Sequence, residues 1–252
     1  MAADTVVIQV IILLLGLWGL YALYQYLSGS TPPTVTLLSG TQPGNPQTAP
    51  PVVRSDNLPP LYQGGEFSVS TWIYVNNWSV NQNKNKSILR IGGSSFDTLR
   101  IYLGPSTPTL MIRVNNGDDK RDLRTDDKTF TDLQTGASAF ESTRICDIPS
   151  IDMQRWVHIC VVVNGMTCDV YLDGKLTRSC ILPTYFVVDK NYAAYLLDDG
   201  QGGAGGFGGS ITTTTMYGYA LSPDVIYTNY LGGPNQITSF WQYLASFFAP
   251  SK

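Results

Sequence analysis

The side chains best suited to catalysis are few in this chain. Glycoside hydrolysis needs two carboxylates at a fixed separation, yet the 252 residues include only two glutamates, Glu66 and Glu141, and neither has a carboxylate two positions away. The single histidine, His158, lies two residues before Cys160 in a run that is typical of a strand. Residues two apart on one strand point the same way and are poorly placed as a Cys–His pair. The sequence therefore predicts a protein that is not an enzyme, with a structural His158.

Cysteine chemistry is the second candidate. The four cysteines lie within 35 residues of one another, at Cys146, Cys160, Cys168 and Cys180. Cys168 and Cys180 flank an Asp-Gly turn and are expected to face each other across a strand pair. Four cysteines allow three disulfide connectivities. Disulfides and buried free thiols both remain open from the sequence.

The first 27 residues place the chain at a membrane. Residues 6–23 carry no charge and one strongly polar side chain, Gln9, and a helix needs roughly 20 mainly apolar residues to cross a bilayer. A cleaved signal peptide has a basic start and a shorter apolar core, whereas no Lys or Arg precedes Arg54 here. The sequence thus predicts a retained single-pass anchor with residues 5–27 in the bilayer. Without basic flanks its orientation cannot be assigned.

A proline-rich stretch follows the anchor. Residues 28–65 hold eight of the fifteen prolines, and proline fixes φ and removes a donor. An extended linker is expected, either as a stalk or as a strap along a partner surface. The net charge of −3, with both signs interspersed, lacks the basic footprint of a nucleic-acid-binding protein.

From residue 66 onward the pattern favours short β-strands. Residues 67–75 alternate and are rich in β-branched and aromatic side chains, and residues 87–92, 98–103 and 109–114 are similar. Runs at 156–163 and 167–172 are followed by Asn164-Gly165 and Asp173-Gly174, which suit tight hairpin turns. Many short strands with regular turns indicate an antiparallel sandwich, and Trp72 and Trp156 are expected in its core.

Four separated segments then follow one another in the order of a known family. They are residues 67–75, 156–175, 207–211 and 217–230. These segments resemble the first core strand, the central hairpins, the closing strand and the short last helix of laminin-G-like, concanavalin A-like jelly rolls. Ser222 and Pro223 suit the N-cap and first residue of that helix. The resemblance covers residues 66–233 and implies an all-β, two-sheet antiparallel jelly-roll sandwich; a fold alone does not imply a function.

The resemblance also suggests two binding sites. Laminin-G modules often hold calcium at the sandwich rim through hard oxygen ligands, and Asp198-Asp199 is a weak candidate, since most acidic loop pairs are simply solvated. Sugar-binding members use exposed aromatics and amides on loops, and Trp78 is flanked by amides between residues 76 and 85. An ordinary polar loop is the alternative there. No other cofactor is expected.

The C-terminal tail, residues 234–252, carries a candidate partner surface. Apolar residues recur at helical spacing opposite serines and a glutamine, which predicts a short amphipathic helix without charge. Packing on its own sandwich, on a membrane or in a partner groove are all open. The candidate contact residues are Phe240, Trp241, Leu244 and Phe248.

Together, the anchor (1–27), linker (28–65), jelly roll (66–233) and tail (234–252) predict a non-enzymatic structural protein that tethers a membrane to a protein shell. The arrangement resembles minor capsid proteins of large icosahedral DNA viruses with an internal membrane. This implies capsid or other shell proteins as partners and a place in the inner membrane of a virion, beneath the capsid. The alternative is a cell-surface or extracellular glycan-binding adhesion module on a membrane stalk.

Overall fold

The computed structural model describes residues 2–27, 34–46, 52–116, 146–198 and 205–234. Within helix α1, side chains are described for Gln9, residues 11–21 and Leu23. The elements are α1 (Ala2–Leu27), β1 (Thr34–Leu38), β2 (Gln42–Pro43), β3 (Val52–Arg54), the 3-10 helix η1 (Ser55–Asn57), β4 (Glu66–Asn77), β5 (Lys86–Gly92), β6 (Asp97–Leu103), β7 (Leu110–Val114), β8 (Trp156–Asn164), β9 (Thr167–Leu172), β10 (Lys175–Ile181), β11 (Ala193–Leu196), β12 (Gly208–Tyr217) and α3 (Pro223–Leu231).

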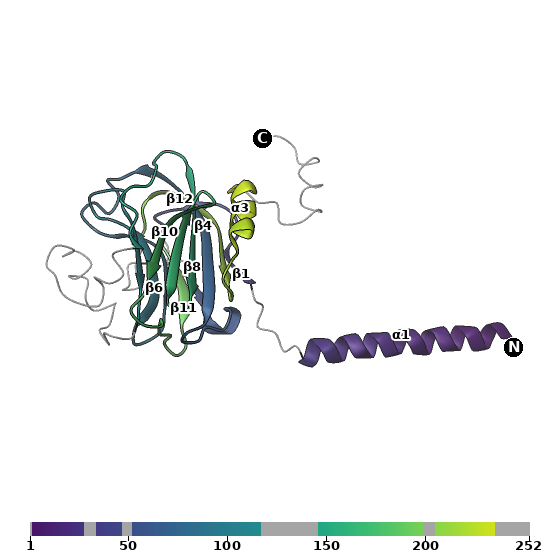
Figure 1. Ribbon diagram of the computed structural model, residues 1–252. Helices are drawn as coiled ribbons and strands as arrows, with labels where there is room; N and C mark the ends of the chain where they lie inside the picture. Colours follow the sequence, from purple (N-terminus) through teal and green to yellow (C-terminus); the bar gives the residue numbers. More distant parts are fainter. Residues whose placement is uncertain (1, 28–33, 47–51, 117–145, 199–204, 235–252) are drawn as a thin grey trace, which may run out of the picture.

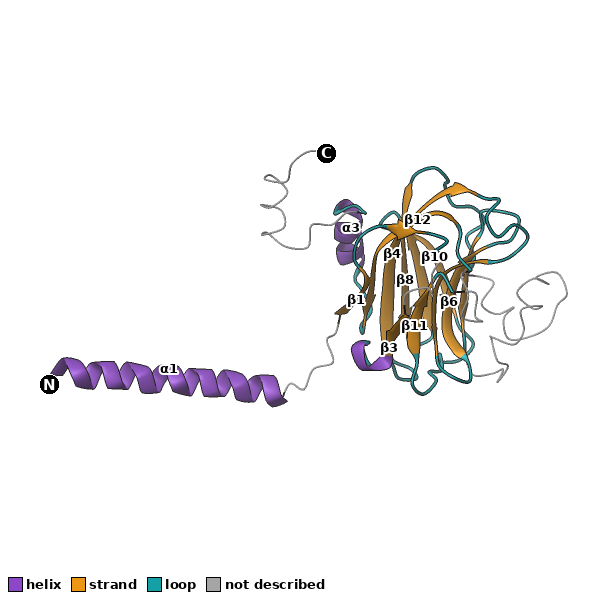
Figure 2. Cartoon of the chain, turned by 180° about the vertical axis from the view of Figure 1, so that it is seen from behind, coloured by secondary structure: helices purple, strands orange, loops and turns teal. Residues whose placement is uncertain are grey.

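The strands form two antiparallel sheets packed face to face (Figures 1 and 2). One sheet has the order β1-β12-β4-β8-β9-β10, with β2 pairing beside β1 on β12. The other has the order β3-β11-β5-β6-β7. In the first sheet β12 lies between β1 and β4, although both of these strands are far from β12 in sequence. The connections between these neighbouring strands are therefore not simple hairpins. The all-β two-sheet sandwich predicted from the sequence is confirmed.

Local sequence explains the central strands well. In β4 and β8 the side chains that face the other sheet are apolar except for Thr71, and Phe67 pairs with Val163 across the ladder. The β8–β9 and β9–β10 turns have positive φ at Gly165 (59°) and at Asp173 and Gly174 (50° and 74°). Gly and Asp tolerate such values best. The two hairpins therefore lie where their turn residues predict them.

The hydrophobic core has two parts. The larger one fills the space between the sheets, with Phe67, Ile91, Val161 and Phe207 among its fully buried members. The smaller one lies on the outer face of the first sheet, where Ile226 of α3 packs with residues of β8 and β9. Thus α3 covers part of that outer face, as Figure 1 shows.

The two tryptophans expected in the core lie elsewhere. Trp72 is buried, but under α3, where its ring stacks on Tyr230 with centroids 5.8 Å apart. Trp156 is only half-buried and packs beside Tyr74 with ring centroids 5.6 Å apart. Both occupy positions on the outward face of the first sheet, because the larger core takes the alternate residues of each strand. The core position predicted for Trp156 is therefore wrong.

The structure corrects the prediction of an extended linker over residues 28–65. Instead of a free extended linker, it contributes β1 and β2 to one sheet and β3 to the other. These strands are short and lie at or beside a sheet edge, where a proline's missing donor is tolerated; Pro43 of β2 is an example. Only residues 28–33 separate α1 from the sandwich in sequence.

The N-terminal segment forms the 26-residue helix α1, which leads away from the sandwich in both views (Figures 1 and 2). Its described apolar side chains are exposed, with Trp18 at 69% and Leu20 at 65%. Within the part of the chain that the structure describes, no helix combines the length and the hydropathy needed to cross a membrane.

One disulfide joins the cysteines, between Cys146 and Cys180, while Cys160 and Cys168 are buried free thiols. Cys146 stands just before Ile148, which bridges to Leu110 of β7, and Cys180 lies in β10. The bond thus connects edge regions of the two sheets. Cys168 pairs in register with Cys180, as the turn between them predicts.

Candidate functional site

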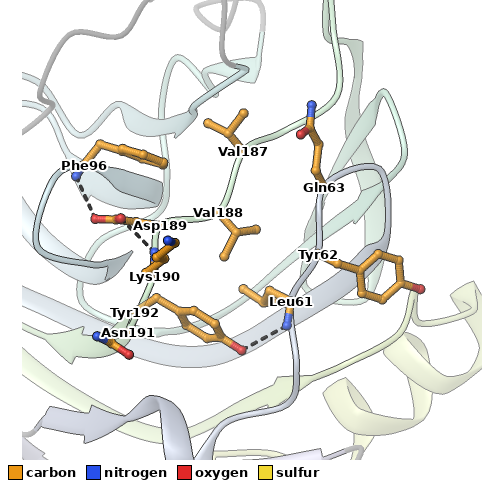
Figure 3. Close-up of a pocket in the computed structure, with 10 residues that line it drawn as sticks. All are labelled: Leu61, Tyr62, Gln63, Phe96, Val187, Val188, Asp189, Lys190, Asn191 and Tyr192. Carbon is orange, nitrogen blue, oxygen red and sulfur yellow. Dashed lines mark hydrogen bonds between the residues drawn. The ribbon is translucent and has the colours of Figure 1, made fainter.

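A groove at one end of the sandwich is the clearest candidate site. It encloses about 520 Å³, within the range of small-molecule pockets. The loop before β4, the β5–β6 turn and the loop before β11 form its walls (Figure 3). The lining residues are Leu61, Tyr62, Gln63, Phe96, Val187, Val188, Asp189, Lys190, Asn191 and Tyr192.

Hydrogen bonds to Tyr192 hold the first wall. Its hydroxyl donates to the Pro59 carbonyl at 2.6 Å and accepts from the Leu61 backbone N–H at 2.9 Å. The Tyr192 phenol thus joins residues 59–61 to the start of β11, the strand that begins directly after Tyr192. Figure 3 shows its bond to Leu61. Burial raises the pKa of the Tyr192 hydroxyl, so the group stays protonated and keeps donating at neutral pH.

A buried carboxylate holds the second wall. Asp189 Oδ2 accepts from the Phe96 backbone N–H at 3.2 Å and from that of Ser95, and Oδ1 accepts from the Lys190 N–H at 2.7 Å. A side chain at Gly93 would lie 2.5 Å from this carboxylate, so glycine makes room for it. Asp189 therefore binds backbone amides of both loops, a structural role.

Tyr62 is the most exposed aromatic in the groove, at 64%. The turn that carries it is closed by a bond from the Gly65 N–H to the Tyr62 carbonyl at 3.0 Å, and Gly64 has a φ of +76°. A Cβ at Gly65 would lie 2.6 Å from the Tyr62 ring. The ring thus rests directly on the backbone of its own turn, which fixes its position.

Polar side chains line the same groove. Gln63, Lys190 and Asn191 are exposed, and Asn191 has a φ of +54°, in the left-handed region that Asn tolerates. The groove therefore combines aromatic faces with amide donors and acceptors. This combination suits a polar ligand with apolar faces, such as a sugar ring, more than a charged nucleotide.

The structure also brings a serine and the histidine together. Ser70 Oγ and His158 Nε2 are 2.8 Å apart. Both are buried next to Trp72, which lies under α3, so no substrate reaches them. Burial lowers the pKa of His158 to about 4, which keeps the ring neutral. The structural role expected for His158 agrees with this packing.

The glutamates give no catalytic pair among the described residues. Glu66 is half-buried at the start of β4, and Glu141 lies outside the described residues. The candidate contacts Phe240, Trp241, Leu244 and Phe248 also lie outside them.

Trp78 does not present an open face. The indole is half-buried against the main core, and Lys86 Nζ lies 4.4 Å from its ring centroid. Lys86 is itself buried and donates to the carbonyls of Asn81, Lys84 and Pro105 at 3.2, 3.4 and 3.2 Å. This ammonium closes the loop around Trp78 and covers one face of its ring. The described packing gives Trp78 a role within its own loop.

Asp198, one weak calcium candidate, is paired with the side chain of Arg90. It is buried, and its Oδ2 accepts from Arg90 Nε at 2.8 Å and from a second guanidinium nitrogen. A calcium ion would have to displace this pairing. Asp199 lies outside the described residues. Among those described, the one group of three close potential metal ligands is Cys146, Cys168 and Cys180, two of which form the disulfide.

The sequence did not reveal a row of arginines on the second sheet. Arg90, Arg100 and Arg113 are direct cross-strand neighbours on β5, β6 and β7. Asp97 pairs with Arg90 at 2.9 Å and with Arg100 at 2.5 Å, while Asp147 binds Arg113 through both carboxylate oxygens. Like charges side by side repel, so the aspartates are required there. Strand register, which the sequence does not specify, creates this row.

Comparisons with known proteins agree with the fold. The family model described as the concanavalin A-like lectin/glucanases superfamily matches residues 50–227. No curated protein sequence matches the chain.

Solved structures similar to this chain are distant. One is a Trypanosoma rangeli sialidase in complex with 2,3-difluorosialic acid (12% identity, 70% of this chain, 24% of that chain, TM-score 0.46). Another is the botulinum neurotoxin serotype D ligand binding domain in complex with N-acetylneuraminic acid (12% identity, 79% of this chain, 50% of that chain, TM-score 0.48). A third is domain 4 of AbnA, an arabinanase from Geobacillus stearothermophilus, in complex with arabinotriose (16% identity, 67% of this chain, 69% of that chain, TM-score 0.41). The chain spans about a quarter of the sialidase and half of the toxin domain.

Proposed function

We propose, from the premise that this chain belongs to the concanavalin A-like lectin/glucanase superfamily, that it is a non-enzymatic glycan-binding module held at a membrane by its N-terminal helix. The observation that carries the proposal is the groove at the end of the sandwich. Its lining includes the exposed Tyr62 ring and the amides of Gln63 and Asn191, and hydrogen bonds hold its walls in place.

Sugar recognition suits this chemistry. A sugar ring has an apolar face that packs on an aromatic ring, and hydroxyls that pair with amides. The only carboxylate in the groove lining, Asp189, is engaged by three backbone N–H groups. The groove therefore offers recognition without an acid–base pair for hydrolysis.

Membrane attachment is supported by the complete sequence of α1, which includes side chains that the structure does not describe. Residues 6–23 are uncharged, and the 26-residue helix would be about 39 Å long. Its described apolar side chains contact no core and remain exposed. Deleting residues 1–27 is expected to leave a folded domain that no longer floats with lipid vesicles; flotation of the truncated protein would show that attachment does not depend on α1.

The glycan-binding proposal is tested with a matched pair of tyrosine variants. The full chain in detergent is screened on immobilised glycans, and Kd is measured for the best ligand. Tyr62→Ala is expected to weaken binding about tenfold or more, near 1.4 kcal/mol, because the stacking face is lost. Tyr227→Ala removes a similarly exposed ring from α3 and should leave Kd unchanged. Equal affinities for both variants and the unaltered protein would contradict the assignment.

A second candidate is the tether between a membrane and a protein shell, as in a viral minor capsid protein. The observation that favours it is β10, a seven-residue edge strand with five successive exposed positions, residues 175–179. A shell protein could add a strand to such an edge. Loss of co-purification with a shell lattice in Thr177→Pro, but not in Tyr62→Ala, would support this function over glycan binding. The Phe240→Ala, Trp241→Ala double variant tests the tail in the same assay.

A further inference from the structure

The connection between α1 and the sandwich limits which face meets the bilayer. Six residues, 28–33, separate Leu27 from Thr34, so the Cα atoms of these two residues lie at most roughly 25 Å apart. Thr34 begins β1 and pairs with Tyr217 of β12. If α1 is in the membrane, the neighbourhood of Thr34 and Tyr217 is therefore the part of the domain held closest to it.

Helix α3 lies in that neighbourhood. Asn229 of α3 donates to the Tyr217 hydroxyl at 3.2 Å. Figure 1 shows α3 and α1 on the same side of the sandwich, and Figure 2 agrees from behind. The short connection thus brings the outer surface of α3 within reach of the bilayer.

The outward surface of α3 carries three exposed apolar side chains beside the polar Asp224 and Thr228. Ile226 and Tyr230 face the sheet, whereas Val225, Tyr227 and Leu231 are 43%, 46% and 65% exposed. The apolar surface continues beyond the helix. Exposed Leu176 of β10 pairs with Tyr171, which packs beneath α3, and so lies on the same face of the sheet.

Charge on α3 argues against an electrostatic contact. The helix carries one acidic residue, Asp224, and no Lys or Arg. Interfacial helices that bind unaided usually combine apolar and basic residues. A weakly apolar surface becomes effective when a tether holds it at high local concentration, and Tyr is a residue that settles at the membrane–water boundary.

We propose that α3 is a second membrane contact: with α1 inserted, Val225, Tyr227, Leu231 and Leu176 rest in the bilayer interface and fix the orientation of the sandwich. The inference rests on the proposed membrane attachment. It leaves the groove clear of the lipid, because the groove is formed by loops at the end of the sandwich and not by the outer face that carries α3.

Fluorescence quenching by brominated lipids tests this contact. Leu231→Cys and, as control, Ser106→Cys are prepared in the full chain and labelled with an environment-sensitive fluorophore. Ser106 is exposed in the β6–β7 turn of the other sheet. The native free thiols are buried and remain unlabelled under native conditions. Thermal unfolding of both labelled proteins is compared with that of the unaltered chain to show that the fold is kept.

Each protein is reconstituted into phosphatidylcholine vesicles with brominated or ordinary acyl chains. The label at position 231 is expected to lose fluorescence in brominated vesicles, whereas the label at 106 keeps it. Equal fluorescence of the 231 label in both lipids, in protein that floats with the vesicles, overturns the α3 contact alone. Failure of the full chain to float refutes the membrane attachment, and the inference with it.

Discussion

Replacing Tyr192 with phenylalanine tests how the groove is built. The variant keeps the ring but removes the hydroxyl that donates to Pro59 O at 2.6 Å and accepts from Leu61 N–H at 2.9 Å. Each bond contributes about 1 kcal/mol, and a buried group left without a partner costs about 1–3 kcal/mol. Because Pro59 is buried, we expect a loss of about 2–3 kcal/mol in the free energy of unfolding.

Urea unfolding followed by tryptophan fluorescence measures that loss. For a domain of this size, about 2–3 kcal/mol corresponds to a Tm lower by roughly 4–12 °C. Glycan affinity should fall as well, since the 59–61 segment that carries Leu61 and leads to Tyr62 is no longer held. The control is Tyr227→Phe, whose ring is exposed on α3; it should change stability by less than about 0.5 kcal/mol.

An unchanged free energy of unfolding in Tyr192→Phe would refute the reasoning, since the two hydrogen bonds would then contribute nothing. Lower stability with unchanged glycan affinity would separate the two claims: the clamp would be structural, and the groove would not depend on it.

Four further outcomes are expected. Acid should destabilise the domain as pH falls from about 6.5 to 4, by up to about 3 kcal/mol from His158, because burial lowers its pKa to about 4 and the unfolded chain takes up the proton first; an equally steep urea-unfolding profile in His158→Gln would contradict this. Reducing the Cys146–Cys180 disulfide, which closes 34 residues, should cost about 3–4 kcal/mol, measured by unfolding with and without reductant. In the native protein the Cys168 thiol should resist alkylation, since burial raises its pKa to about 12; rapid labelling found by mass spectrometry would show that the strand pair opens. Trp72→Ala should cost about 3–5 kcal/mol, because the ring is buried under α3 and stacks on Tyr230, and a near-unchanged Tm would mean that α3 does not pack there.

The strands that the sequence predicted are those whose signals are local. Alternation and turn residues mark β8, β9 and β10, and the positive φ at Gly165 and Gly174 follows directly from the Asn-Gly and Asp-Gly pairs. The start of the last helix is also local: Ser222 has the extended backbone of an N-cap, although its side chain makes no capping bond, and Pro223 is the first residue of α3.

The edge strands and the groove could not be predicted in this way. Proline content made 28–65 resemble a linker, yet edge positions tolerate proline and the segment supplies three strands. The groove joins residues 61–63 to 187–192, more than 120 positions apart, and only the closed sandwich brings them together. For Trp78 the sequence predicted a site that the structure does not support. An aromatic residue among amides suggested an exposed ring, but Lys86 covers one face of that ring.

Hydrogen–deuterium exchange of the full chain, with and without the best glycan from the screen, tests the central claim most directly. If the groove is the binding site, exchange slows in peptides covering residues 58–65 and 187–192 and stays unchanged in the peptide covering α3. Unchanged exchange in both loops, with protection at residues 76–85 around Trp78 instead, would contradict the groove assignment and return the site to the loop that the sequence alone suggested.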